Sequence, residues 1–587
     1  MGLDYALVHV TYNIPVAGLM TLLFWPFMTR LDWQKISTLI IISLVATIPW
    51  DSYLLRHHIW TYSSDALIGW TLFSIPLEEI FFFAIQTYNT SLLYTNLTRP
   101  LVLPANLRIT SRKQTIAGTF IILSAILAGL IAIYCGGCCT YTGLIVTWAG
   151  PFLLIQWLFS SAFILAVPTT ELIASIVLPT VFLWVVDTLS IKRGIWSIET
   201  PTKFGIQLWG CMDIEEAIFF LVTNILIVVG LVSIDYANAI TTCQLVQSSE
   251  PIQNFPSYFQ MLLHFMMGKY VPDKRFVDSL TESVEHLAAY SQSMYMGSAL
   301  FQGPLRIDLI LLYSFCRVAD NLVDDARDTK SARIVIEECD HLLEAKFSHP
   351  NSFPPLPDPK RANYAAPPEL IAAIDRLPVS RLRLEHLKGL LEGFRTDLAF
   401  GNNPDSFPIA TESDLDTYSS HVASTVAASM LGLIVHYFPN HPFAVNVLLR
   451  RRVVDAAERM GQALQYINVA RDIVLDAAIN RVYLPTTWLN EQGLCPTDVL
   501  VFPTDPRLES VRERLLERAD FLSASARSEI AFLPREVQGP LLALVDSYLE
   551  IGAALRRGMR PRKAGEKLKL PIGRRLWVAY RAMALRR

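Results

Sequence analysis

The sequence has few charged residues and almost no net charge. Aspartate, glutamate, lysine and arginine make up 18% of its 587 residues, and the formal net charge is −3. So small an excess gives no electrostatic basis for holding a polyanion, and we expect no nucleic-acid partner. The eight cysteines follow no regular spacing, which argues against a disulfide framework.

The sequence also lacks the signals of a secretory signal peptide and of a cysteine-histidine metal site. The N-terminus has no short apolar segment followed by a cleavage site, so no removable signal peptide is predicted. Three cysteines do cluster, at Cys135, Cys138 and Cys139, but no histidine or carboxylate lies near them in the sequence. We expect a structural role in a loop, and a metal site is the alternative.

Hydrophobic residues are abundant instead. They make up 52% of the chain, and the mean hydropathy is +0.35, which is high for a soluble protein of this size. The excess lies within residues 1–240, and the remainder resembles a soluble helical protein. About seven segments have the length needed to cross a bilayer, at 5–27, 37–55, 66–92, 115–135, 142–166, 169–188 and 206–233.

The charges in the loops give these spans a direction. One face carries more positive residues, namely Arg30, Lys35, Arg99, Arg108, Arg112 and Lys113. The other face carries fewer, chiefly Arg56, Lys192, Arg193 and Lys203. The positive-inside rule makes the first face cytoplasmic. An odd number of spans then puts the C-terminal half in the cytoplasm, as part of an integral multi-pass membrane protein.

The membrane half contains an internal repeat. Glu78-Glu79 in "SIPLEEIFFFAIQ" recurs as Glu215-Glu216 in "GCMDIEEAIFFLVTN". Asp51 and Trp60 likewise recur, as Asp187 and Trp196. We infer a duplicated three-helix unit, at about 1–97 and 142–235, with the fourth span as connector. Units separated by an even number of spans are parallel, which predicts a pseudo-twofold axis along the membrane normal.

The repeated acids point to chemistry, because an unpaired carboxylate in a bilayer is costly. A buried carboxyl group near a second one tends to stay protonated, and such a group can act as a general acid. Nearby aromatic rings can face a carbocation. We therefore expect protonation of an alkene, with the two aspartates orienting or relaying. Two alternatives are structural ion pairs with Arg56, Lys192 or Arg193, and a proton-coupled transporter.

Residues 241–260 read as a linker, and residues 261–587 as a second domain. Amphipathic helical patterns fill this domain, interrupted by a proline-rich loop at 348–369. Strand signals are few, so an all-α domain is predicted. Its basic C-terminal stretch, 556–587, suggests a surface that faces a membrane.

Two segments of this domain carry oxygen ligands at helical spacing. "LLYSFCRVADNLVDD" places Asp320 and Asp324 on one helix face, one turn after Arg317. "QALQYINVARDIVLDAAINRVYLP" forms a second stripe with two arginines beside it, comprising Gln465, Asn468, Asp472, Asp476, Arg471 and Arg481. Carboxylates on two helices suit Mg²⁺ that also binds substrate phosphates, and arginines suit diphosphate. A solvated acidic helix face is the alternative.

These segments, together with "YSSHVASTVA", resemble the squalene/phytoene synthase family over 285–585. The resemblance implies an all-α isoprenoid-synthase fold and Mg²⁺ (or Mn²⁺) bound with diphosphate by Asp320, Asp324, Asn468, Asp472 and Asp476. It also implies that the leaving group is held by Tyr313, Arg317, Arg471 and Arg481. In "YSSHVAS", His421 replaces the family's second tyrosine, which makes it a candidate for the proton steps. "RVYLP" is similar to the phytoene branch, for which no NADPH is expected.

The whole chain resembles the fungal bifunctional lycopene cyclase/phytoene synthases. Their membrane half is similar to heterodimeric-type lycopene cyclases fused in tandem, with a "PLEE"-like motif in each half. Pro76-Leu77-Glu78-Glu79 matches the motif, and Asp213-Ile214-Glu215-Glu216 keeps its acids without the proline. No Gly-x-Gly-x-x-Gly fingerprint is present, so no FAD is expected.

The resemblance implies two activities. The C-terminal half would condense two geranylgeranyl diphosphates to phytoene through prephytoene diphosphate. The membrane half would cyclise lycopene to γ- or β-carotene, after a separate phytoene desaturase has acted. Candidate catalytic residues are Glu78, Glu79, Glu215, Glu216, Asp51 and Asp187 in the cyclase, and Tyr313 and His421 in the synthase. Which glutamate is the acid stays open. The alternative is a squalene-type synthase fused to a proton-coupled transporter.

Overall fold

A computed structural model describes residues 2–107, 112–248, 257–267, 273–350, 366–400, 407–561, 563 and 565–585. The chain forms two compact units. The first comprises Met1–Cys243 with Pro256–Asp278, and the second comprises Gln244–Phe255 with Ser279–Arg587. The predicted linker 241–260 begins inside a helix, because helix α8 (Ile214–Gln247) ends only at Gln247. Its residues 249–256 lie outside the described residues.

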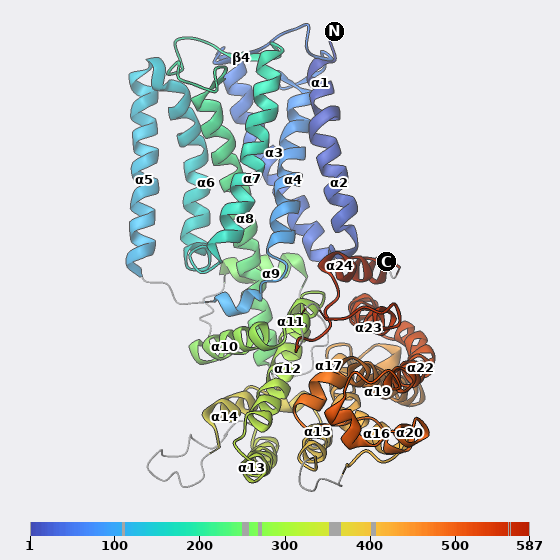
Figure 1. The fold of residues 1–587 in the computed structure, drawn as a ribbon. Helices are drawn as coiled ribbons and strands as arrows, with labels where there is room; N and C mark the ends of the chain where they lie inside the picture. Colours follow the sequence, from blue (N-terminus) through green and yellow to red (C-terminus); the bar gives the residue numbers. More distant parts are fainter. Residues whose placement is uncertain are drawn as a thin grey trace. The chain divides into compact units, whose positions relative to one another are not determined.

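Long helices run side by side in the N-terminal unit, and α5 stands at the outer edge of the bundle, packed on α6 (Figure 1). Its helices are α1 (Asp4–Val8), η1 (His9–Asn13), α2 (Ile14–Phe24), η2 (Trp25–Phe27), α3 (Arg30–Arg56), α4 (Leu77–Leu97), η3 (Leu103–Asn106), α5 (Arg112–Cys135), η4 (Gly137–Cys139), α6 (Thr140–Ile164), α7 (Thr169–Lys192), α8 and α9 (Tyr258–Met267).

Seven helical segments among the described residues are long and apolar enough to cross a membrane. Six belong to this unit: Asp4–Phe27, Arg30–Arg56, Arg112–Cys135, Gly137–Ile164, Thr169–Lys192 and Ile214–Gln247. The seventh, Glu412–Tyr437, lies in the C-terminal unit. The predicted third span, 66–92, is therefore not among the seven. Its helix α4 stands within the bundle but buries many polar side chains, including Asn89, Thr90 and Thr95.

Both glutamate pairs lie in the first turn of a helix, Glu78-Glu79 in α4 and Glu215-Glu216 in the candidate span α8, rather than in the middle of a helix as the apolar runs had suggested. Strands β2 (Thr71–Leu72) and β3 (Ile75–Pro76) form a hairpin directly before α4. Its two-residue turn, Phe73-Ser74, has φ angles of 54° and 72°, as a type I′ turn requires. The free N–H groups of a first helical turn favour carboxylates, so the glutamates sit at a suitable place.

The second repeat has the same hairpin, with one more residue in its turn. Strands β5 (Gln207–Leu208) and β6 (Met212–Asp213) pair with Leu208 opposite Met212, which leaves three residues between them. The first hairpin leaves only two. This extra residue accounts for the change in offset between repeats, from 136 positions before the hairpin to 137 after it.

A strand pair joins the two repeats reciprocally. Strand β1 (Trp60–Tyr62) pairs antiparallel with β4 (Trp196–Ile198), with Trp60 opposite Ile198 and Tyr62 opposite Trp196. Trp60 is equivalent to Trp196 in the repeat, and Tyr62 is equivalent to Ile198. The two end pairs of this ladder therefore join the same two repeat positions, in opposite directions. A twofold axis through the central pair, Thr61 and Ser197, produces this register.

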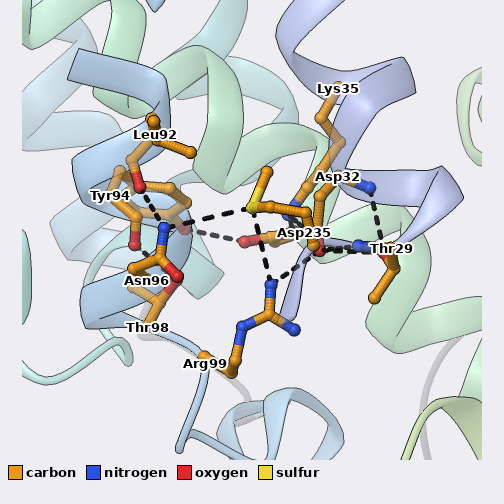
Figure 2. Close-up of polar contacts among 10 residues, drawn as sticks. Thr29, Asp32, Lys35, Leu92, Tyr94, Asn96, Thr98, Arg99 and Asp235 are labelled. Carbon is orange, nitrogen blue, oxygen red and sulfur yellow. Dashed lines mark hydrogen bonds and ion pairs between the residues drawn. The ribbon is translucent and has the colours of Figure 1, made fainter. Parts of the chain in front are cut away.

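A buried ionic cluster joins α3, the chain after α4, and α8 (Figure 2). Lys35 Nζ lies 2.8 Å from Asp235 Oδ1 and 3.5 Å from Asp32 Oδ1. Arg99 contacts Asp32 at 2.7 Å, and the Tyr94 hydroxyl donates to Asp235 Oδ2 at 2.9 Å. Two cations and two carboxylates balance, as buried charges must. Among the described residues, Arg56, Lys192 and Arg193 form no ion pair, so the alternative of structural ion pairs with the repeated acids finds no support.

The C-terminal unit is all-helical in its described parts, as predicted. Its helices are α10 (Lys274–Tyr290), α11 (Gln292–Ser298), α12 (Gly303–Asp324), α13 (Thr329–Ser348), α14 (Pro368–Asp375), η6 (Val379–Arg381), α15 (Leu384–Asp397), α16 (Glu412–Ser419), η7 (Ser420–Ser424), α17 (Thr425–Tyr437), α18 (Pro442–Val445), α19 (Val447–Ala478), α20 (Thr486–Glu491), α21 (Pro496–Val501), α22 (Leu508–Arg527), η8 (Ser528–Phe532), α23 (Arg535–Arg556) and α24 (Ile572–Ala584).

Helix α19 occupies the centre of this unit, in contact with α17, α22, α23 and η7. Two hydrophobic cores meet along it, and each buries residues of α19. Gly461 lets the η7 backbone approach closely, since a Cβ there would stand 2.8 Å from Ser424 Cα. Helix α24, within the basic tail, leaves Ile572, Leu576 and Trp577 exposed.

Two candidate active sites

The membrane unit holds a small acidic cavity of about 30 Å³. Three carboxylates line it: Glu79 from α4, Glu216 from α8 and Asp187 from α7. The other lining residues are largely aromatic or apolar, namely Tyr5, Val8, His9, Asn13, Trp60, Tyr62, Phe82, Leu183, Val186, Ser190, Trp196, Phe219 and Phe220. The cavity thus combines buried acids with aromatic walls, drawn from both repeats.

Tyrosine hydroxyls hold the two cavity glutamates. Tyr5 and Tyr62 both donate to Glu79 Oε2, the latter at 2.6 Å. Tyr141 donates to Glu216 Oε1 at 2.8 Å. Each of the two glutamate residues is 3% exposed or less, so these contacts replace water. Sequence reasoning missed all three tyrosines.

The other two glutamates bind loops. Glu78 Oε1 accepts the Ile68 N–H at 2.8 Å, and Glu215 Oε1 accepts the Phe204 N–H at 2.6 Å. Neither glutamate lines the cavity. The structure therefore divides each pair: the first glutamate fastens a loop to the helix start, and the second faces the cavity.

The two candidate aspartates differ in position. Asp187 lines the cavity, whereas Asp51 does not. Asp51 is fully buried, and neither of its carboxyl oxygens has a hydrogen-bond partner among the described residues. It remains close enough to Glu79 and Glu216 to interact with them electrostatically.

An aromatic stack stands beside the acids. The Trp50 ring lies 4.8 Å from that of Trp148 and 5.4 Å from that of Phe219, in both cases stacked. Phe219 also lines a second, mostly apolar cavity of about 70 Å³ between α3, α4, α6 and α8. The π faces of such rings can stabilise a passing cation.

The C-terminal unit contains a much larger cavity, of about 470 Å³. Its polar lining residues include Tyr313, Arg317, Asp320, Asp397, Gln465, Asn468, Arg471, Asp472, Glu529 and Lys567. Its apolar lining residues include Leu390, Phe394, Val426, Met430, Ile434, Val453, Met460, Leu533 and Leu541. Such a cavity suits a ligand with a charged head and a long apolar tail.

Each aspartate motif is paired with arginine. Arg317 contacts Asp320 at 2.6 Å, and Arg481 contacts Asp324 at 2.8 Å, which joins the start of the loop after α19 to α12. Arg471 binds both oxygens of Asp472, at 2.7 and 2.6 Å. The two predicted segments are thus brought together.

The residues present fit a divalent cation only with help from a ligand. Among the described residues, no three histidine, cysteine, aspartate or glutamate side chains are grouped to hold a metal. Yet Asn468 Oδ1 is buried without a partner, while its Nδ2 donates to Gln465. Burial and nearby Asp472 raise the pKa of Asp476 to about 8. Mg²⁺ typically uses one or two carboxylates plus substrate phosphates, which this arrangement allows.

The structure does not place His421 on the cavity, although the sequence had suggested it for proton steps. Tyr418, at the start of the same motif, lies there instead, together with Asp397. Burial raises the pKa of Asp397 to about 6, and Tyr483 donates to Asp397 Oδ1 at 2.7 Å. The motif contained a signal for Tyr418, whereas Asp397 stands in no recognisable pattern.

The cysteine cluster lies in η4 and at the end of α5, between two helices of the bundle. Cys135 and Cys138 are exposed, and the sulfurs of Cys138 and Cys139 stand 3.9 Å apart. All three are free thiols. Their place in a tight connection agrees with the expected loop position.

Comparison with known proteins covers both units. The squalene/phytoene synthase family model matches residues 287–574. A bifunctional lycopene cyclase/phytoene synthase of Aspergillus oryzae is 71% identical over the full length of both chains. One from Arthroderma gypseum is 45% identical, covering 99% of this chain and all of its own. A solved dehydrosqualene synthase, at 17% identity and a TM-score of 0.43, covers 53% of this chain and 98% of its own. The chain therefore belongs to the family of bifunctional lycopene cyclase/phytoene synthases.

Proposed function

We propose that this chain carries out two steps of carotenoid biosynthesis, one in each unit. The observation that carries the proposal is the presence of two separate sites with different chemistry. One cavity pairs carboxylates with aromatic rings inside a membrane bundle, and the other pairs aspartates and arginines with an apolar cavity. Full-length relatives named for both activities support this assignment.

The C-terminal unit is a phytoene synthase that condenses two geranylgeranyl diphosphates. Asp320, Asp324, Asn468, Asp472 and Asp476 would hold Mg²⁺ or Mn²⁺, which supplies charge neutralisation of the departing diphosphate. Arg317 and Arg471 line the cavity and would bind diphosphate oxygens. To do so they must exchange the aspartate contacts that they make without substrate. The C20 chains occupy the apolar part of the cavity.

The exclusion of water is this unit's second task. An allylic cation forms when the first diphosphate leaves, and the second substrate's alkene must reach it before water does. The apolar lining from α15, α17 and α23, which includes Phe394, Met430 and Leu541, would surround the chains. A cyclopropyl intermediate, prephytoene diphosphate, ionises in turn at the polar end and rearranges to phytoene.

A direct test of this unit uses the full-length protein with geranylgeranyl diphosphate. Phytoene and diphosphate should form only when Mg²⁺ or Mn²⁺ is present, and no NADPH should be needed. Squalene-type reduction that depends on NADPH would instead favour the other branch of the family. Metal-independent synthesis would refute the assigned role of the aspartates.

The membrane unit is a lycopene β-cyclase. A cavity glutamate protonates the terminal alkene of lycopene, the neighbouring double bond attacks the resulting cation, and loss of a proton closes the ring. The stacked Trp50, Trp148 and Phe219 would stabilise the cation. The reaction is an isomerisation, so it needs no redox cofactor. The desaturation steps between phytoene and lycopene require a separate enzyme.

The cavity is smaller than the end of a polyene, so Phe219 or its neighbours must move to admit substrate. The apolar cavity that Phe219 also lines, and the exposed Ile42 that lines it too, would offer a route from the bilayer. A transporter would instead move a solute across vesicles and leave lycopene unchanged. The test is lycopene in vesicles without any ion gradient, where ring formation is expected and transport is the contrary result.

The membrane unit has a preferred orientation. Arg30, Lys35, Arg99, Arg112 and Lys113 lie at the ends of helices opposite to Arg56, Lys192 and Arg193. By the positive-inside rule the first end faces the cytoplasm, together with the C-terminal unit. Protease digestion of sealed membranes should remove the C-terminal unit from the cytoplasmic side only.

A further inference from the structure

The two halves of the membrane unit hold their cavity glutamates unequally. Tyr5 and Tyr141 are equivalent positions of the repeat, and each donates to the glutamate of its own half. Tyr62 adds a second donor to Glu79. Its equivalent in the other half is Ile198, which has no hydroxyl. Glu79 thus accepts two hydrogen bonds where Glu216 accepts one.

This difference matters because the surroundings are otherwise shared. Both glutamates line the same cavity, start equivalent helices and are almost fully buried. Both hydroxyls on Glu79 converge on Oε2, so the extra donor adds directly to the stabilisation of its negative charge. Among the described residues, Glu79 Oε1 and Glu216 Oε2 accept no hydrogen bond, which leaves one oxygen of each carboxyl group for substrate.

We propose that Glu216 is the general acid and Glu79 the general base of the cyclisation, with Tyr62 as the positioning residue that makes them different. The inference rests on the proposed cyclase function and deepens it. A carboxylate that accepts two hydroxyl donors keeps its charge better than one that accepts a single donor. Glu79 is therefore the group that waits ionised, and Glu216 the one that waits protonated.

The proposed step balances without a co-reactant. The O–H bond of Glu216 breaks as a C–H bond forms at the terminal alkene. The neighbouring double bond supplies the electron pair of the new ring C–C bond. A C–H bond beside the new cationic carbon then breaks, its electrons form the ring double bond, and Glu79 takes the proton. Glu79 returns that proton to Glu216 across the shared cavity, which Asp187 also lines.

Other titratable groups face these two carboxyl groups, and a pH measurement must take account of them. They are His9, Tyr5, Tyr62, Tyr141, Asp51, Asp187 and Asp213, with the adjacent Glu78 and Glu215. Lys203 neutralises Asp213 at 2.7 Å. Asp51 and Asp187 act on both glutamates, whereas Tyr62 hydrogen-bonds Glu79 alone. A change at Tyr62 is therefore specific to one of the pair.

The test compares two Tyr→Phe variants of the full-length protein, using the pH dependence of lycopene cyclisation. A base must be ionised and an acid protonated, so the profile is bell-shaped. Tyr62→Phe should move the acidic limb to higher pH, because Glu79 holds its charge less well. Tyr141→Phe should move the basic limb to higher pH, because Glu216 stays protonated longer. Each shift should be about one pH unit or more.

Tyr53→Phe, at an exposed position outside the cavity, is the matched control and should move neither limb. If the two variants move the opposite limbs, the roles are reversed and the proposal is overturned. If neither variant moves a limb, the tyrosines do not set the difference and the proposal is also overturned. Phytoene synthesis by the same chains reports that each variant is present and that its C-terminal unit is folded.

A second measurement separates this proposal from the cyclase function itself. In deuterium oxide, Glu79→Gln should form no ring but should return lycopene that carries deuterium, because the acid still works. Glu216→Gln should return unlabelled lycopene. Label from the Glu216 variant and none from the Glu79 variant would reverse the assignment. If both variants still cyclise lycopene normally, the cyclase site itself is wrong, and the proposal fails with it.

Discussion

The adjacent residues Glu215 and Glu216 have different surroundings, and we predict that only Glu216 acts in catalysis. Glu216 lines the acidic cavity, and Glu215 accepts a backbone N–H from Phe204 at 2.6 Å. Glu→Gln keeps the size and the acceptor oxygen of each side chain but removes the acid. The two substitutions should therefore have effects of different kinds.

Glu216→Gln should slow cyclisation by about 10²- to 10⁴-fold, which corresponds to about 3 to 5 kcal/mol of barrier. Glu215→Gln should keep its hydrogen bond to Phe204 and lose only the contribution of the charge. That loss should cost about 1 kcal/mol of stability and should leave the rate of cyclisation within a few-fold of the wild type.

The assay is conversion of added lycopene by each variant in membranes, with product carotenes resolved by chromatography. Phytoene formation from geranylgeranyl diphosphate serves as the internal control for the amount of protein and for folding of the C-terminal unit, and it should be unchanged in both. An equal loss of cyclisation in the two variants would refute the division of each glutamate pair. Normal cyclisation by Glu216→Gln would refute the acid assignment altogether.

Three further predictions follow from contacts elsewhere in the chain. Asp320→Ala or Asp472→Ala should abolish phytoene formation while added lycopene is still cyclised, and phytoene at near wild-type rate would exclude these residues as metal ligands. Lys35→Met should destabilise the membrane unit by about 3–5 kcal/mol, because Asp235 is left buried without its cation. The double variant Lys35→Met with Asp235→Leu should recover much of that stability in thermal unfolding. Equal stability of the single and double variants would argue against the ionic cluster. Gly461→Ala should lower the free energy of unfolding by about 1–3 kcal/mol and reduce phytoene formation, because its Cβ would stand 2.8 Å from Ser424 backbone atoms. An unaffected melting temperature would contradict that packing.

The repeat, the helical class and the aspartate motifs were all readable from the sequence. They depend on local spacing: residues four apart share a helix face, and a duplicated unit repeats its landmarks at a constant offset. For this reason Asp320 and Asp324 are found on one helix, α12, and Asp472 and Asp476 on another, α19, and Asp320 and Asp472 line the same cavity. The single-residue slippage between repeats was also visible, although its cause, a longer hairpin turn, was not.

The breaks before the glutamate pairs were not readable, because hydropathy ran almost unbroken from Leu72 into α4. The hairpin depends on Phe73 and Ser74 adopting positive φ, which neither residue type favours. No glycine or asparagine marks this turn in the sequence, so hydropathy alone does not separate the hairpin from the helix that follows. Because the start of the helix was not predicted, the sequence also did not show which glutamate of each pair faces the cavity.

Long-range polar partners were the other class that sequence reasoning missed. Tyr5 meets Glu79 across 74 positions, and Lys35 meets Asp235 across 200. A lone tyrosine in an apolar run carries no local sign of such a partner. The sequence shows that Tyr62 and Ile198 differ, but only the fold shows that the Tyr62 hydroxyl reaches Glu79.

The most direct test of the two-site account is the set of carotenoids made by one purified chain in membranes. The chain is supplied with geranylgeranyl diphosphate and Mg²⁺, with or without a separate phytoene desaturase. Phytoene alone should form without the desaturase, and cyclic carotenes should form with it. Squalene-type products, or linear lycopene that accumulates without rings, would contradict the account.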